Sequence, residues 1–240
     1  MRRRVVPFIT ALAAVATFAT GCGLTDQGPR PGVAAEVDGE TLRLAQVDEA
    51  VEEYCVLRAE HPEAVPVARA SIRAQFTLGW TQAVAVERLA AEYDVSLPPE
   101  KVHRAAVEAA WGELGEIDDD NYEAFAWLTW IQARLTSPVE ALGSRKLEEE
   151  TGQGSVGQAA VDRGVVLIQE WMQEEDLQLN PVLGELDEEN GLFSSDALSV
   201  PVSDEAKQAA STEQSQEYVA NLPAGQRCGP EAASPEVGQG

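Results

Sequence analysis

The sequence predicts a mainly helical α+β domain that includes a small β-sheet. Asp38 and Gly39 lie between short apolar runs at residues 34–37 and 41–43, and these two residue types accept the positive φ angles of a two-residue hairpin turn. Helical spacing of apolar residues dominates the chain that follows, until a strand pattern appears at residues 177–180. Because an isolated hairpin is only marginally stable in water, we expect the helices to cover its apolar side.

Helices are expected where apolar residues recur at i, i+3 and i+4. The first follows the hairpin directly and carries Val47, Val51 and Cys55 on one side. Similar patterns cover residues 65–93, 100–114 and 122–135, and a charged helix is expected at residues 137–150 from the capping signal at its start. The last helix is expected to pack through Val161, Val165, Ile168, Trp171 and Met172.

Polar residues mark the beginnings of the last three helices. Asp119 or Asp120 is placed to cap the first of these, because a short carboxylate accepts hydrogen bonds from free backbone N–H groups. Ser137 and Glu140 have the spacing of a capping box for the next one. Ser155 is expected to cap the last helix.

The first 21 residues have the organisation of a secretory signal peptide. A basic segment at residues 2–4 precedes an apolar run at residues 5–19 that is too short to span a bilayer permanently. Cys22 has the position of a lipobox cysteine, which is acylated after cleavage. An ordinary signal peptide with an incidental cysteine is the alternative. We expect residues 22–32 to be a lipidated tether and the protein to be exported and lipid-anchored at the outer face of the bacterial cell membrane.

The chain is strongly acidic. It contains 17 Lys and Arg and 41 Asp and Glu, a net charge of −24. Removal of residues 1–21 takes away three arginines and no acid, so 14 basic and 41 acidic residues remain, a net charge of about −27. Nucleic acid is therefore excluded as a partner, because phosphate binding needs clustered Lys and Arg. Like charge also keeps a protein with exposed apolar surface soluble.

Acylation of Cys22 would leave Cys55 and Cys228 as the remaining cysteines. An oxidising compartment favours a disulfide between them, and closure of so long a loop contributes on the order of 4–5 kcal/mol in the chain-entropy model. Two free thiols are the alternative. The disulfide would tie the C-terminal tail to the first helix.

Two motifs resemble those of the SurA/PrsA/trigger-factor group of extracytoplasmic chaperones. Residues 35–42 (AEVDGETL), followed by residues 47–51 (VDEAV), resemble the opening of such chains. Residues 177–187 (LQLNPVLGELD) resemble the strand with which these chaperones return to close the N-terminal hairpin. Gly184 and Asp187 match that second pattern, whereas its usual Arg and Trp are replaced by Val182 and Leu186.

The resemblance implies a SurA-like domain at residues 33–202, in which a returning C-terminal strand completes the small sheet. Residues 203–240 are rich in Ala, Gln, Glu, Ser and Pro and predict a largely disordered acidic tail, apart from the disulfide. The implied function is to bind unfolded or newly exported polypeptides. Related chaperones often carry a parvulin prolyl-isomerase domain, but this chain has no β-rich insert and only two histidines, His61 and His103. We therefore expect no isomerase activity.

The sequence offers no catalytic, metal or cofactor site that we would select. Residues 152–157 fit GxGxxG but follow a charged helix instead of a buried strand, so we interpret them as a helix connection. The acidic clusters at residues 118–121 and 187–190 lack the calcium-loop pattern and are interpreted as solvated turns.

Aromatic residues are the candidates for client binding, because they give a large contact area for little loss of entropy. They lie on three predicted helices: Trp80, Trp111, Phe125, Trp127 and Trp130. Burial in the core is the alternative for each. The helix at residues 122–135 is apolar on almost all sides, which favours a binding surface there. The alternative function is a lipoprotein subunit that docks one specific envelope partner. Oligomeric state stays open.

Overall fold

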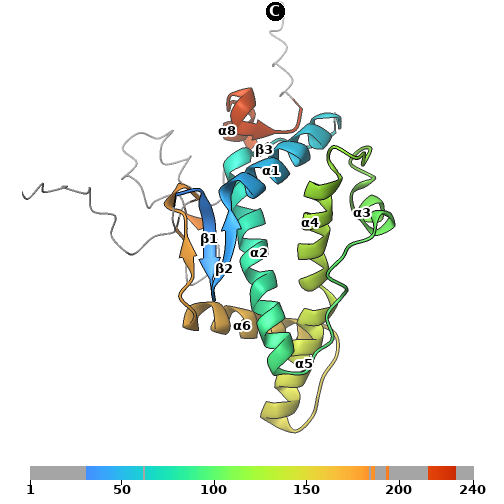
Figure 1. Ribbon diagram of the computed structural model, residues 1–240, viewed down its shortest axis with the longest axis vertical. Coiled ribbons are helices and arrows are strands. Elements are labelled where there is room, and N and C mark those ends of the chain that lie inside the picture. The colour runs from blue at the N-terminus through green and yellow to red at the C-terminus, as the bar shows by residue number, and fades with distance from the viewer. Residues whose placement is uncertain (1–30, 62, 184, 187–192, 195–215, 231–240) are drawn as a thin grey trace, which may run out of the picture.

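The computed structural model describes residues 31–61, 63–183, 185–186, 193–194 and 216–230. Within these ranges the chain is mainly helical, and a small antiparallel sheet lies against one side of the helices (Figure 1). This confirms the predicted fold class. The signal segment, Cys22 and most of the tether lie outside the described residues.

The N-terminal hairpin consists of β1 (Val33–Val37) and β2 (Glu40–Arg43). The turn residues Asp38 and Gly39 have φ angles of 46° and 78°, which is the conformation that the Asp-Gly pair predicts. The side chains of Val37 and Leu42 are 1% exposed. The hairpin therefore buries one face against the helices. We expected this, because an isolated hairpin is only marginally stable in water.

The returning strand is β4 (Gln178–Leu179), which pairs antiparallel with β1 and gives the sheet order β2-β1-β4. Asn180 extends the pairing: its backbone N–H donates to the carbonyl of Ala34 at 2.8 Å, and its side-chain amide donates to the carbonyl of Val33 at 2.7 Å. The predicted closure of the sheet by a C-terminal strand is thus confirmed. Residues 184 and 187 of the second chaperone-like motif lie outside the described part of the chain.

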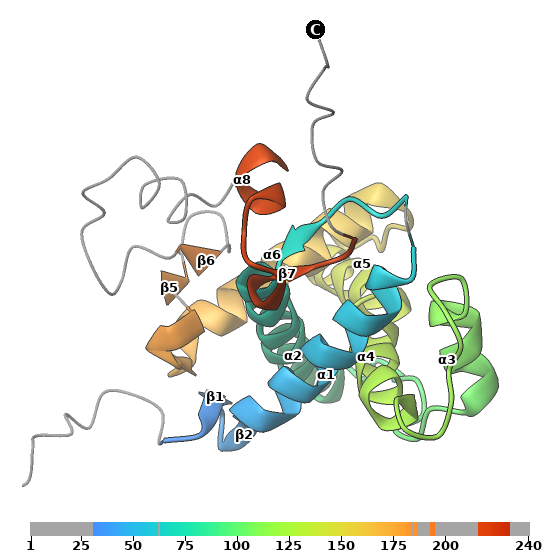
Figure 2. The same ribbon diagram turned by 90° about the horizontal axis from the view of Figure 1, so that it is seen from above.

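Helix α2 (Arg69–Glu92) runs through the centre of the molecule and contacts the sheet and most other helices (Figures 1 and 2). Helices α1 (Leu44–Ala59) and α4 (Tyr122–Arg134) pack beside it, and α3 (Arg104–Trp111) packs on the outer side of α4. The expected start of α2 at residue 65 is wrong. Residues 67–68 instead form β3, because the C-terminal tail pairs with them as a strand. Helix α3 is also shorter than expected.

Helices α5 (Ser137–Thr151) and α6 (Gln158–Glu174) form a tightly packed hairpin. Gly143 and Gly164 lie where the two backbones meet, since a Cβ atom added at either would collide with backbone atoms of the opposite helix. This contact turns α6 so that Ala160, Gly164 and Leu167 face inward. The expectation that Val165 packs inward is therefore wrong, because its side chain is 43% exposed.

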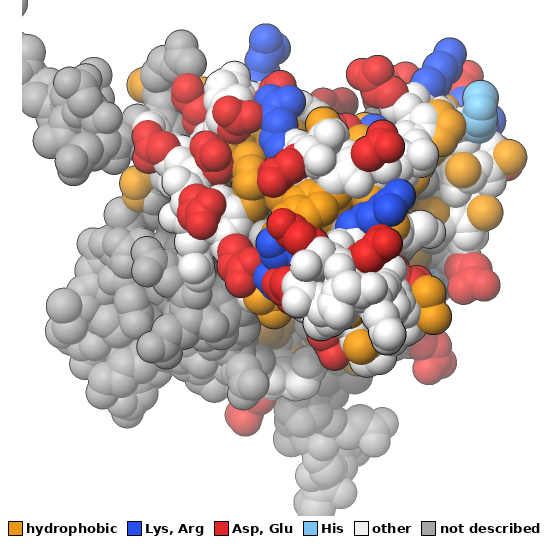
Figure 3. Space-filling model, turned by 90° about the horizontal axis from the view of Figure 1, so that it is seen from below, with side chains coloured by type: hydrophobic (Ala, Val, Ile, Leu, Met, Phe, Trp, Pro, Cys, Tyr) orange, Lys and Arg blue, Asp and Glu red, His pale blue; other side chains and the backbone are white. Residues whose placement is uncertain are grey.

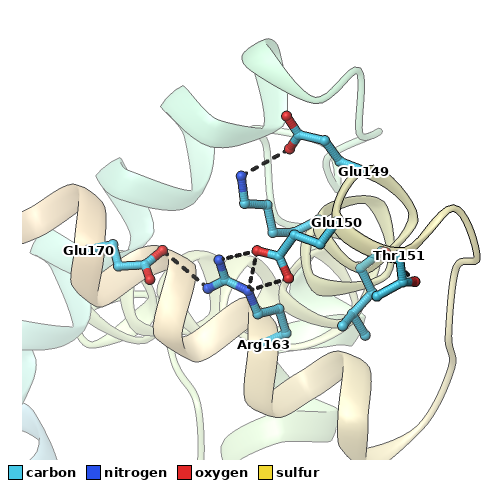
Figure 4. A network of polar contacts seen from close by, with 7 residues as sticks. Glu149, Glu150, Thr151, Arg163 and Glu170 are labelled. Atoms are coloured by element: carbon cyan, nitrogen blue, oxygen red, sulfur yellow. Dashed lines mark hydrogen bonds and ion pairs between the residues drawn. The ribbon is translucent and has the colours of Figure 1, made fainter.

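Ion pairs join the same two helices. The Arg163 guanidinium on α6 donates to Glu150 on α5 at 2.6 Å and to Glu170 on α6 at 3.1 Å (Figure 4). Arg163 holds the pKa of the Glu150 carboxyl below its usual value. The single positive charge of Arg163 therefore offsets part of the negative charge of the two carboxylates.

The helix caps differ from the sequence prediction. Asp118, and neither Asp119 nor Asp120, accepts backbone N–H bonds before α4, from Asp120 at 2.9 Å and Asn121 at 3.0 Å. The capping box at Ser137 does not form; Glu140 instead accepts the N–H of Gly157 at 2.6 Å. Gly157, which precedes α6, replaces Ser155 as its cap, with a φ of 74° that favours glycine. A side chain of α5 thus holds the N-cap residue of α6 in place, where we expected a local serine to act.

The C-terminal tail packs over α1 and β3 (Figures 1 and 2). It contributes α8 (Gln216–Ala220), η2 (Ala224–Gln226) and β7 (Arg227–Cys228). Cys228, 1% exposed, forms a disulfide with Cys55 of α1, and the two Cα atoms are 4.5 Å apart. Residues 216–230 are thus folded, although their composition predicts disorder. A second short hairpin, β5 (Glu185–Leu186) with β6 (Phe193–Ser194), follows η1 (Pro181–Leu183).

Candidate functional site

A groove of about 640 Å³ lies between α1, α2, α4 and the segment that precedes α3. We call it the Trp groove. Its aromatic lining is Trp80, Tyr122, Trp127 and Trp130. Its charged lining is Glu49, Glu100, Lys101 and Glu123. Three of the five aromatic residues selected from the sequence therefore meet in one cavity.

Helix α4 divides its side chains between the core and the groove. Trp127 and Trp130 are three residues apart, so they lie on one side of the helix, where both are half-buried and line the groove. Phe125 and Leu128 point to the other side and are 0% and 4% exposed. The helix is apolar on almost all sides because one face packs into the core and the opposite face carries the tryptophans that line the groove.

Trp111 and Phe125 belong to the core, and their assignment to a binding surface is corrected. Trp111 is 8% exposed, and its indole N–H donates to the Thr129 hydroxyl at 3.0 Å. Its ring lies against that of Phe125, with centroids 5.4 Å apart. Neither residue lines the Trp groove. Sequence periodicity could not make this distinction, because it depends on the packing of α3 on α4, which places the Trp111 ring against that of Phe125.

Neighbouring side chains hold the groove aromatics in place. Phe76 contacts the edge of Trp127, with centroids 6.5 Å apart. The Arg134 guanidinium lies 4.3 Å from the ring centre of Trp130, and its Nε donates to Glu87 at 2.8 Å. A buried cation that is paired with a carboxylate and stacked on an indole has little freedom to move. The two tryptophans are therefore preorganised as contact surface.

The rim of the Trp groove is acidic. Glu49, Glu100 and Glu123 form no ion pair with any residue in the described ranges, and Lys101 is the one cation in the lining. Burial raises the pKa of nearby Glu53, as do the charges of carboxylates around it, first Asp118 and then Glu49. Unneutralised negative charge therefore concentrates on this side of α1.

A second groove of about 450 Å³ lies where α2, α5 and α6 meet. Val139, Val161, Val165 and Ile168 line it. Of the two α6 valines that we expected inside the core, Val165 is exposed and Val161 is half-buried. The sequence signal for this groove was present, since the valines of α6 recur at helical spacing. On the face seen from below, hydrophobic side chains gather in a hollow that acidic and basic side chains surround (Figure 3).

The acidic cluster at residues 187–190 lies outside the described part of the chain, and the other described residues singled out in the sequence form no site. His61 makes a 2.6 Å hydrogen bond with the carbonyl oxygen of Leu114, and His103 is exposed at the start of α3. Residues 152–157 connect α5 to α6. Within the described ranges, no three His, Cys, Asp or Glu side chains are placed to hold a metal ion. Nor does any helix described there have the length and apolarity to cross a bilayer.

Comparison with family models, curated proteins and solved structures finds no match for this chain. The geometry of the Trp groove and the two chaperone-like sequence motifs are therefore the basis for a function.

Proposed function

We propose that this protein is a lipid-anchored extracytoplasmic chaperone that holds unfolded or newly exported polypeptides in the Trp groove, without prolyl-isomerase activity. The observation that carries the proposal is the pair of half-buried indoles of Trp127 and Trp130, which line one groove together with the buried Trp80. Aromatic surface that is partly open to solvent has a cost unless a partner covers it.

The dimensions of the groove suit a short segment of chain. Its volume of about 640 Å³ lies in the range of sites that enclose a few side chains. Rigid indole rings offer a client large contact area with little loss of entropy and without demanding one sequence. A chaperone that accepts unrelated clients needs this combination.

The rest of the chain supports the same function. The hairpin closed by a returning strand agrees with what the SurA-like motifs imply. The net charge of −24 favours solubility of a complex with a sticky client. It also repels anionic lipid headgroups, so we propose that acylation of Cys22 keeps the protein at the membrane.

The test is suppression of aggregation. Several unrelated clients, unfolded chemically and then diluted, should stay soluble at near-stoichiometric amounts of the protein, as followed by light scattering. Trp127→Ala combined with Trp130→Ala should abolish most of this protection. Trp171→Ala is the matched control, because Trp171 is also half-buried but lies on α6 outside the groove.

Two results would contradict the proposal. One is wild-type protein that protects no client; the other is a double variant that protects as well as wild type and Trp171→Ala while remaining folded by circular dichroism. Recovery of one partner only, in stable amounts, from solubilised envelopes would instead support a docking subunit.

A further inference from the structure

Arginines compensate some carboxylates of the molecule, whereas those on the rim of the Trp groove have no ion pair within the described ranges. Arg88 lies 2.5 Å from Asp38 and 3.1 Å from Glu40, so part of the negative charge at the turn of the hairpin is compensated. Arg163 does the same for two carboxylates between α5 and α6 (Figure 4). Ion pairs thus compensate acidic groups at these places, while the groove rim keeps its charge.

Glu49, Glu100 and Glu123 come from three separate segments: α1, the chain before α3, and α4. None is ion-paired within the described ranges, and only Lys101 opposes them in the lining. The nearby cation Arg104 is already engaged, since it pairs with Asp119 at 2.5 Å. Within the described part of the chain, the groove therefore presents three carboxylates without an ion-pair partner beside its aromatic lining.

The negative region continues along α1. Glu53 lies one turn beyond Glu49, and Asp118 and Asp120 lie close enough to it that, together with burial, they raise its pKa. A segment that leaves the groove along α1 would thus meet more negative charge.

On the basis of the function proposed above, we infer that the Trp groove selects segments in which Lys or Arg adjoins an aromatic or large aliphatic residue. The apolar side chain packs on Trp127 and Trp130. The adjoining cation reaches the carboxylates of the rim, where it also lies near indole faces that attract cations. Acidic segments are rejected, because binding would bring their carboxylates next to those of the rim and remove part of the water that surrounds both.

The same charge argues against occupants other than a basic segment. The chain's own residues 203–240 contain more acids than bases, so they are unsuited to fill the groove. A second copy brings another net charge of −24, and an anionic lipid surface is repelled in the same way. The selection would therefore direct the groove to foreign, cationic chain segments.

The test uses three fluorescent peptides that share one Phe- and Leu-containing centre and differ only in flanking residues, which are Arg and Lys, Gln, or Glu. Binding to the full mature chain is measured by anisotropy. The cationic peptide should bind about tenfold more tightly than the Gln peptide, the effect of two or three partly exposed ion pairs, and the Glu peptide should bind most weakly. At about 1 M salt, where the Debye length is about 3 Å, the difference should disappear.

Glutamine variants distinguish the effect of the three rim carboxylates from the effect of the protein's net charge. Glu49→Gln, Glu100→Gln and Glu123→Gln together should remove the preference for the cationic peptide and leave affinity for the Gln peptide within about twofold. The control replaces three exposed glutamates that do not line the groove and changes the net charge equally: Glu63→Gln, Glu92→Gln and Glu174→Gln. The control variant should keep the preference.

The outcomes distinguish this inference from the function on which it rests. Suppose that the Gln peptide binds through Trp127 and Trp130 and that the cationic peptide binds with the same affinity. The inferred charge selection is then wrong, and the chaperone proposal stands. If the two triple variants lose the preference equally, overall charge and not the rim causes it, which also overturns the inference. If none of the peptides binds, both proposals fail.

Discussion

Removal of the disulfide should destabilise the folded chain strongly. Cys55 and Cys228 are 173 positions apart in the sequence, and closing a loop of that length reduces the entropy of the unfolded chain by the equivalent of about 5 kcal/mol at 25 °C in the chain-entropy model. Residual structure in the unfolded chain reduces the effect. We therefore expect Cys55→Ser with Cys228→Ser to lower the free energy of unfolding by about 3–5 kcal/mol.

Urea denaturation followed by far-UV circular dichroism measures this change. Oxidised wild type, reduced wild type and the double variant should be compared, and the last two should unfold at the same, lower urea concentration. The native protein should also expose neither thiol to an alkylating reagent until a reductant is added. Stoichiometric alkylation of both cysteines in the folded, unreduced protein, with a urea curve that a reductant does not shift, would refute the reasoning.

Three further substitutions test the packing and the charges. Gly143→Ala places a methyl group against the Ala160 carbonyl, so the two helices must separate. The substitution also gains about 1 kcal/mol in helix propensity. The net result should be a loss of about 2 kcal/mol in the free energy of unfolding, measured by urea titration. Phe125→Ala empties a fully buried site and should cost about 3–5 kcal/mol in the same assay. Glu53→Gln removes a carboxylate whose folded-state pKa is raised, so wild type loses stability as pH rises through that pKa and the variant does not. The variant should be more stable by a few tenths of a kcal/mol at pH 7, and equal stability of the two proteins from acid to neutral pH would contradict this.

Local patterns were sufficient to predict the framework of the fold. Asp38 and Gly39 specify their turn through backbone conformation alone, and Val47, Val51 and Cys55 lie on the buried side of α1 as their spacing indicates. The returning strand at residues 178–179 needed more than local information, because its pairing with β1 was implied by the resemblance of two distant motifs.

Features that depend on distant contacts could not be predicted. Residues 67–68 are extended because the tail strand β7 pairs with them. Glu140 accepts the backbone N–H of Gly157, 17 residues later, at the start of α6, and no local pattern indicates such a partner. Val165 is exposed because glycine contacts set the rotation of α6.

Only part of the candidate site could be predicted, because the rest of it also depends on contacts between distant segments. Trp127 and Trp130 were selected from the apolar excess of their helix, and both line the groove. Phe125, on the same helix, was selected with equal reason but faces the core, because α3 packs over that side. The acidic rim was missed altogether, since its three glutamates come from separate segments that only the fold brings together.

Photo-crosslinking from inside the groove tests the central claim most directly. A photoreactive amino acid at position 127, in the lipid-anchored protein within native envelopes, should crosslink to many different exported polypeptides while they are unfolded. The same group at position 182, where Val182 is 55% exposed and outside the groove, should capture few of them. Equal capture from both positions, or one recurring partner from position 127, would contradict the account.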